Sequence, residues 1–486
     1  MEDVQNLSMV DAPWGVLLMA LFMLLGVCNF YFFIWERIVV SHKWGRFRTV
    51  PFVFLSLLTI VSCVAFIVLM KVGSFDKLIL AMSLGCGVVV SLVHPVISVS
   101  FFLLNLILRP WEYLPDTAII TILPKGLAAL CFVSWLIFNF RVGKFKIIWN
   151  GSCLLFMLFL GWAFIAAILG GGVQEGTRFF LERFIPIFVL FFLIFNSVHD
   201  RSDLRLVEVS LIIAVLGMVI SAEVYTKALL TGERLMGGKL FGNANDLAAT
   251  IVMVLPFLFF PLQKRFTYTW IPILVTLIFL LYGIILADSR SAKLALAAMV
   301  GVHFLITYRI TLTRLILGGV LVVVLLLTLM MTSRSASDLR GSSFSRINYA
   351  ITGLKMLKSN PVWGVGLGNY PKRYEEFTSD FSEYGERTAH SSWVLVMAEA
   401  GLPGLVLFLA FFFSVLGKAW RMRHARAAFF LAMVGYGIMM SFLSHTYLFL
   451  PYILFALVLV GYRIFSISEA QGVKYRPKQR RRRMAF

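Results

Sequence analysis

Charged residues are scarce in this 486-residue chain, at 14% of the total, whereas hydrophobic residues make up 60%. A water-soluble fold cannot bury such a large apolar share, so the composition excludes a soluble globular protein. The apolar residues form long continuous runs, and a bilayer admits only helices or closed barrels. The sequence therefore predicts an all-α polytopic integral membrane protein.

Cysteine is also rare, and none of the five cysteines belongs to a CxxC pair. All of them lie inside apolar runs, where cysteine is typical of a small core residue, which excludes a disulfide framework and a zinc site. The chain has no HExxH motif and no closely spaced pair of histidines. We therefore expect neither a metal nor a cofactor.

The net charge of +20 raises the question of a nucleic-acid partner. The positive residues follow a membrane topology instead. With the C-terminus in the cytoplasm, the short inner linkers hold more lysine and arginine than the outer linkers, as the positive-inside rule requires. The tail 466–486, which contains KYRPKQRRRR, then serves topology and attraction to anionic lipid. We expect membrane lipids, and no nucleic acid, as partners.

Apolar runs predict about 12–15 transmembrane helices when each span takes roughly 20 residues. The first begins near Trp14, because the acidic amino terminus lacks the basic segment of a cleaved signal peptide. The run 78–108 is interrupted at His94-Pro95, so we expect a short hairpin there. The predicted organisation is N-terminal transmembrane helices over 1–331, a large periplasmic loop over 332–392, C-terminal transmembrane helices over 393–465 and a basic cytoplasmic tail over 466–486.

The polar segment 332–392 is too long for a connector, and we expect it to carry structure and function. Residues 342–361 have a helical pattern, with Ser343 or Ser345 as the cap and Asn360-Pro361 as the end. The stretch VWGVGLGNYPKRY that follows is rich in glycine but has neither the GK[ST] of a phosphate loop nor a preceding strand. It predicts a tight, aromatic-flanked surface turn rather than a nucleotide site.

Charged and polar residues gather on the predicted outer side, in the 223–246 loop, the 288–293 corner and the large loop. Arg234 lies between glycines, whose flexible backbone can approach a ligand closely, and Arg290 has a serine on each side as a further donor. The planar fork of arginine suits phosphate oxygens. The structural alternative is that both are ordinary interfacial arginines paired with neighbouring acidic residues.

His390 ends the polar segment, directly before an apolar run that breaks at Gly401 and Pro403. A histidine at a helix start is commonly a polar cap, but histidine titrates near neutral pH and is also a natural general base. Glu399 is not its direct partner, because nine residues along a helix turn roughly 900° and rise roughly 13 Å. We expect Glu399 to have a structural role at the helix break.

Four segments of the C-terminal half stand out: GERLMGGKLFGNANDLA (232–248), LADSRSAKLAL (286–296), RINYAITGLKMLKSNPVWGVGLGNYP (346–371) and AHSSWVLVMAEAGLPGLVLFL (389–409). Together they resemble the O-antigen ligase superfamily, which includes O-antigen polymerases and O-linked protein oligosaccharyltransferases. The chain has Ser391 where the family usually has asparagine, and GNAN where it often has GNPN.

The resemblance implies a GT-C-type glycosyltransferase in the bacterial inner membrane, with its active site facing the periplasm. The donor would be a glycan on undecaprenyl pyrophosphate, and the reaction would be inverting and independent of metal. His390 would be the catalytic base, and Arg234 and Arg290 would bind the pyrophosphate. Possible sugar or donor contacts are Asn243, Asn245, Arg346 and Tyr370.

The sequence leaves three functions open. A ligase would pass a finished glycan to an acceptor glycan, lipid or protein, whereas a polymerase would add repeat units to a growing polysaccharide with the same donor and base. The segment LRPWEYLP (108–115) is similar to ligase-like proteins found with exopolysaccharide clusters. A transporter or flippase is the third interpretation, but transporters carry ionisable groups at the bilayer midplane, and those of this chain gather at one face.

Overall fold

In a computed structural model of the chain, the structure describes residues 94–109, 117–143, 147–237, 243–259, 270–307, 336–378 and 385–470, with the single positions 145 and 319. Every regular element within these ranges is a helix, which confirms the all-α prediction for this part of the chain. The helices are α4 (Pro95–Leu108), α5 (Thr117–Val142), α6 (Gly151–Gly171), α7 (Val173–Ser197), α8 (Arg201–Thr226), α9 (Ala228–Thr231), α10 (Ala244–Phe259), α11 (Trp270–Leu286), α12 (Arg290–Thr307), α14 (Ala336–Ser359), α15 (Tyr374–Phe377), α16 (Ser392–Arg421), α17 (Ala427–Met440), η5 (His445–Tyr447) and α18 (Phe449–Ala470).

Six of the described helices, α5, α6, α7, α8, α16 and α18, contain segments long and apolar enough to cross a membrane. Four shorter apolar helices, α4, α10, α11 and α17, accompany them. These helices support a multi-pass membrane protein. The predicted spans before residue 94 lie outside the described residues, so the total of about 12–15 helices, which follows from span length, stays a prediction.

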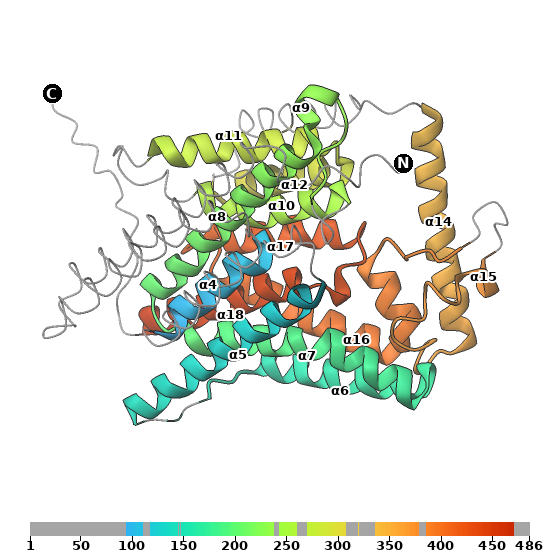
Figure 1. The fold of residues 1–486 in the computed structure, drawn as a ribbon, viewed down its shortest axis with the longest axis horizontal. Helices are drawn as coiled ribbons and strands as arrows, with labels where there is room; N and C mark the ends of the chain where they lie inside the picture. The colour runs from blue at the N-terminus through green and yellow to red at the C-terminus, as the bar shows by residue number, and fades with distance from the viewer. Residues whose placement is uncertain are drawn as a thin grey trace, which may run out of the picture.

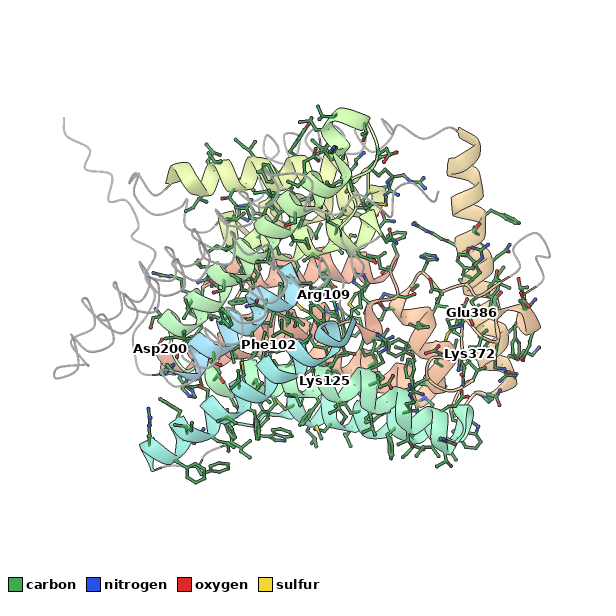
Figure 2. The ribbon with its side chains drawn as sticks, viewed as in Figure 1. Phe102, Arg109, Lys125, Asp200, Lys372 and Glu386 are labelled. Carbon is green, nitrogen blue, oxygen red and sulfur yellow. The ribbon has the colours of Figure 1, made fainter. Side chains whose placement is uncertain are left out.

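The long helices run side by side, and their connections gather at two opposite ends of the bundle (Figure 1). Asp200, between α7 and α8, marks one end, which we call the Asp200 end; Lys372 and Glu386 mark the other, which we call the loop end (Figure 2). Near the α7–α8 connection, Arg426 of the α16–α17 linker forms an ion pair with Glu208 of α8. Linkers predicted to share one side of the membrane therefore lie together, and which end faces the periplasm stays a prediction.

Local sequence explains where individual helices begin. Asp200 and Asp203 form a capping box at the start of α8, in which each carboxylate accepts a backbone amide of the other residue. α4 begins at Pro95, and the side chain of His94 accepts the amide of Val96 at 3.3 Å. Proline suits the first position of a helix, where its missing N–H is not needed. The predicted break at His94-Pro95 is confirmed, since α4 begins there. Residues 78–93, the first arm of the predicted hairpin, lie outside the described residues, so the hairpin stays a prediction.

Helix α14 stands at the loop end, across the direction of the long helices (Figure 1). It begins at Ala336 and ends at Ser359. The predicted end at Asn360-Pro361 is therefore confirmed, but the predicted cap at Ser343 or Ser345 is wrong. Both serines lie within the helix, because serine is tolerated inside a helix and the sequence before it has no apolar period to reveal the earlier turns.

Helix α16 breaks at Gly401, which has φ 68° and ψ −170°. This combination is essentially restricted to glycine. The break lets the glycine-rich turn (residues 361–371) bind to the helix backbone. The amides of Val365 and Leu402 join the turn and the helix with hydrogen bonds of 2.9 Å each.

The carboxylate of Glu399, which is fully buried, holds the same turn with both of its oxygens. Oε1 accepts the amide of Tyr370 at 2.8 Å, and Oε2 accepts the amide of Gly368 at 3.0 Å. A buried amide without an acceptor is costly, so one side chain satisfies two donors of an irregular segment. The structural role predicted for Glu399 is confirmed, as is the turn predicted for VWGVGLGNYPKRY. The predicted surface position of the turn is wrong for residues 364–367 and Tyr370, which are buried because the turn bonds to the backbone of α16.

Replacing Gly401 with alanine should lower the free energy of unfolding by at least about 2 kcal/mol, because its backbone conformation strains any residue with a Cβ. The new Cβ would also lie 2.1 Å from the carbonyl oxygen of Val362. Gly417→Ala is the matched control, since a Cβ at that position of α16 meets nothing within 4 Å. Thermal unfolding of both variants in detergent measures the difference, and equal melting temperatures would contradict the requirement for glycine.

Replacing Glu399 with alanine should loosen the glycine-rich turn, because two buried amides lose their acceptor at about 1–3 kcal/mol each. Trypsin cleavage after Lys372, next to the turn, should become faster in the folded protein. Glu386→Ala removes an exposed carboxylate at the same end of the molecule and should leave the cleavage rate unchanged. A wild-type rate for Glu399→Ala would show that the carboxylate does not hold the turn.

Candidate functional site

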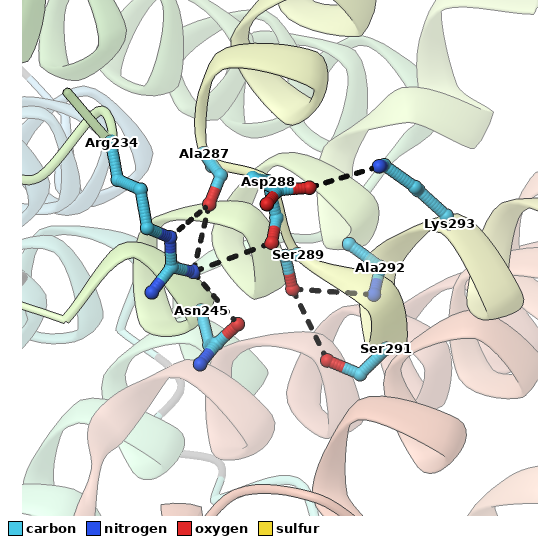
Figure 3. Close-up of polar contacts among 8 residues, drawn as sticks. All are labelled: Arg234, Asn245, Ala287, Asp288, Ser289, Ser291, Ala292 and Lys293. Atoms are coloured by element: carbon cyan, nitrogen blue, oxygen red, sulfur yellow. Dashed lines mark hydrogen bonds and ion pairs between the residues drawn. The ribbon is translucent and has the colours of Figure 1, made fainter. Parts of the chain in front are cut away.

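Arg234 joins the segment before α10 to the corner between α11 and α12 (Figure 3). Its Nε and one terminal nitrogen both donate to the carbonyl oxygen of Ala287, at 3.0 and 2.8 Å. The same terminal nitrogen lies 3.5 Å from Oδ1 of Asn245 and 3.5 Å from the carbonyl oxygen of Asp288. The guanidinium is half-buried. Two of the predicted site residues, Arg234 and Asn245, therefore meet at this corner.

Arg290 is the first residue of α12, directly after the corner that Arg234 contacts. Its side chain is half-buried, and it has no hydrogen-bond or ion-pair partner among the residues that the structure describes. The carboxylate of Asp288 pairs with Lys293 at 3.1 Å instead (Figure 3). The acidic pairing that the structural alternative requires for Arg290 is therefore not present among the described residues.

Asn243 and Asn245 shape the start of α10. Oδ1 of Asn243 accepts the amide of Asn245 at 3.0 Å, and the carbonyl oxygen of Asn243 accepts the amide of Asp246 at 3.0 Å. Asn243 therefore acts at the helix start, where asparagine is favoured because its side chain satisfies an otherwise unpaired amide. This leaves Asn245 in the first turn, beside Arg234.

A buried histidine links α10 to the start of α16. Nε2 of His445 lies 3.0 Å from Oδ1 of Asp246, and Nδ1 lies 2.7 Å from the hydroxyl of Tyr436. The amide of His445 donates to Oγ of Ser392 at 3.0 Å. Ser392 is the first residue of α16 and stands two positions after His390.

His390 occupies an unusual backbone conformation just before α16, with φ 46°. Arg109 and Lys227, which also have positive φ, are C-caps, where this conformation ends a helix. Asp288, with φ 43°, precedes α12. His390 precedes α16, and its ring centroid lies 5.4 Å from that of Tyr349. Strained residues cluster at functional sites, so the conformation points to His390 as a side chain held in a required position.

Tyr370 and Arg346 lie on the α14 side of the site. Tyr370 is fully buried, its hydroxyl donates to the carbonyl oxygen of Tyr349 at 2.6 Å, and burial raises the pKa of its phenol. The guanidinium of Arg346 is half-buried and lies 5.5 Å from the centre of the Phe442 ring. Tyr370 therefore supports Tyr349, which contacts the ring of His390, whereas Arg346 lies against the segment between α17 and η5.

The amino ends of α10, α12 and α16 are joined by these contacts, and we call the region the candidate site. Asn245 and Asp288 connect the first two through Arg234. His445 connects α10 to α16. Helix amino ends carry partial positive charge and unpaired amides. Such ends suit an anion, and His390 stands two residues before the amino end of α16.

Asp246 and His445 were not predicted as site residues. The sequence held a usable signal for His445, which lies in SHTYLF between two apolar runs on the predicted outer side, as His390 does before its own run. Within the described ranges, no group of three or more His, Cys, Asp or Glu side chains could hold a metal ion. The site is therefore described by its two arginines, its helix ends and its histidines.

A comparison with protein families identifies the part of the chain that carries most of these residues. Residues 275–409 match the family described as O-Antigen ligase. The match contains Arg290, Arg346, Tyr370 and His390, and Arg234 and the two asparagines precede it. A search of the curated proteins finds no match. The match confirms the resemblance of this chain to the O-antigen ligase superfamily over residues 275–409.

Proposed function

We propose that this protein is a membrane glycosyltransferase that moves a glycan from undecaprenyl pyrophosphate to a hydroxyl group of an acceptor. The observation that carries the proposal is the set of hydrogen bonds that joins the amino ends of α10, α12 and α16. Arg234 binds the corner before α12, Arg290 begins α12, and His390 stands two residues before α16. Lipid-linked glycans and a membrane setting fit the family that residues 275–409 match. We place the active site on the periplasmic face of the bacterial inner membrane.

The two arginines would stabilise the leaving group. When the bond between the anomeric carbon and the pyrophosphate oxygen breaks, its electron pair moves to that oxygen, and the pyrophosphate gains negative charge. Arg290 has no acidic partner among the described residues and lies at the positive end of α12. Cations that are already in place beside developing charge are most effective where water is partly excluded. The proposed mechanism thus takes its positive charge from the protein and needs no metal.

His390 would act as the general base. It would take the proton of the acceptor hydroxyl while the hydroxyl oxygen attacks the anomeric carbon from the side opposite the pyrophosphate, so the configuration inverts. Asn243, Asn245 and Arg346 are proposed to contact the donor. Tyr370 is proposed to support His390 through Tyr349, because its hydroxyl binds the backbone of Tyr349, whose ring contacts that of His390.

A repeat-unit polymerase would use the same donor, cations and base, and it differs from a ligase in its acceptor. In a deletion strain, loss of long chains with single units retained would indicate a polymerase. Complete polymer that accumulates without attachment would indicate a ligase. A transporter or flippase fits less well, because the arginines and the histidine lie at helix ends rather than midway along the helices.

Purified protein in nanodiscs, supplied with a defined undecaprenyl-pyrophosphate-linked oligosaccharide and candidate acceptors, tests the proposal. His390→Ala and Arg290→Ala should each lower kcat/KM by at least about 100-fold, through loss of the base and of leaving-group stabilisation. Arg290→Lys should also lose activity, because a point charge does not replace the fork of arginine.

Two control variants separate these effects from general damage. Arg178→Ala removes an exposed arginine of α7 that pairs with Glu182 at 2.9 Å, and His424→Ala removes an exposed histidine of the α16–α17 linker. Both should keep wild-type kcat/KM. Full activity of His390→Ala, with protein amount and membrane insertion unchanged, would refute its assignment as the base.

A further inference from the structure

His445 is a buried histidine, 2% exposed, whose ring and backbone each bind a different part of the candidate site. Its Nε2 contacts Asp246 of α10, and its Nδ1 contacts the hydroxyl of Tyr436 in α17. Its amide donates to Ser392 of α16. Helices α10, α16 and α17 therefore meet at one residue, although α10 lies far from the other two in the sequence.

A neutral imidazole ring can form both of these hydrogen bonds, the one to Asp246 and the one to Tyr436. A neutral imidazole has one N–H donor and one acceptor nitrogen. In the tautomer with its hydrogen on Nε2, the carboxylate of Asp246 accepts that hydrogen, and Nδ1 accepts the hydroxyl hydrogen of Tyr436. A ring that is buried and engaged at both nitrogens is suited to holding two elements at a set distance. Neither ring nitrogen is left open to a substrate, because each of them already makes one hydrogen bond.

The contacts of His445 extend to the corner that Arg234 binds and to the start of α16, next to His390. Asp246 follows Asn245, which contacts Arg234. Ser392 follows closely after His390, and it is held to the η5 segment by further bonds: its Oγ donates to the carbonyl oxygen of Leu443 at 2.7 Å, and its carbonyl oxygen accepts Oγ1 of Thr446 at 3.3 Å. Through His445, the arginine corner and the turn that carries His390 are therefore connected by side-chain and backbone hydrogen bonds.

We propose that His445, through its bond to Asp246, is a positioning residue that holds the anion-binding arginine corner in register with His390. This inference rests on the proposed function. Its physical basis is that transfer requires the acceptor oxygen, the anomeric carbon and the leaving pyrophosphate to be aligned, and a misplacement of about 1 Å can cost about 100-fold in rate.

The test compares His445→Gln with His445→Leu in the nanodisc transfer assay. A glutamine amide has one donor and one acceptor group at a spacing close to that of the imidazole nitrogens, but it does not titrate. His445→Gln should keep kcat within about threefold of wild type. His445→Leu should lose at least about tenfold in kcat, with the KM for the lipid-linked donor changed less than about threefold, because alignment is lost while the arginine corner remains.

His94→Leu is the matched control. His94 is also a buried histidine, but it caps α4 and its ring contacts Phe138, which stacks on His199 near the Asp200 end. It should keep wild-type kcat. If His445→Leu is not recovered as folded protein, Asp246→Ala takes its place, because it cuts the same link at a side chain that is 21% exposed.

Hydrogen exchange provides a readout that needs no turnover. In His445→Leu, amides in residues 243–250 and 385–395 should exchange faster together, whereas His445→Gln should match wild type. Unchanged exchange in His445→Leu, or wild-type kcat in that variant, would overturn the proposal. So would a folded His445→Gln as inactive as His445→Leu, which would indicate proton transfer. If wild type transfers no glycan while the coupled exchange is seen, the proposed function fails and the structural link stands.

Discussion

The buried carboxylate of Glu399 is the interaction on which one half of the site depends. It accepts the amides of Gly368 and Tyr370, which an irregular turn cannot satisfy by itself. Tyr370 in turn donates its hydroxyl to the carbonyl oxygen of Tyr349, and the ring of Tyr349 contacts that of His390. A side chain nine residues from the proposed base therefore supports it through the loop that packs over the helix.

The other half of the site depends on helix ends. Arg234 uses its fork to hold the corner before α12. The carboxylate of Asp288 at this corner pairs with Lys293, and Arg290 has no acidic partner among the described residues. Two cations in one region repel each other unless an anion or oriented oxygen atoms compensate. Carbonyl oxygens of the corner compensate Arg234, and the proposed pyrophosphate would compensate Arg290. His445 connects this half to the half that carries His390, because it bonds to both Asp246 and Ser392.

Short sequence patterns predicted those features that depend on the backbone preferences of a few neighbouring residues. The break at Gly401, the turn at residues 361–371 and the end of α14 at Asn360-Pro361 follow from glycine and proline chemistry. The predicted start of α14 was wrong because a serine that resembles a helix cap can also lie within a helix. The pairing of Asp246 with His445 joins residues 199 positions apart, and the partners of Glu399 lie in another segment. Such contacts depend on how helices pack, so no sequence period reveals them.

The proposed transfer is a single displacement at the anomeric carbon, with His390 as the base and the arginines at the leaving group. Nuclear magnetic resonance determines the anomeric configuration of the product that purified protein forms from a donor of known configuration. The new glycosidic bond should have the configuration opposite to that of the donor. A product that retains the donor configuration would require a covalent or two-step route and would rule out the single displacement.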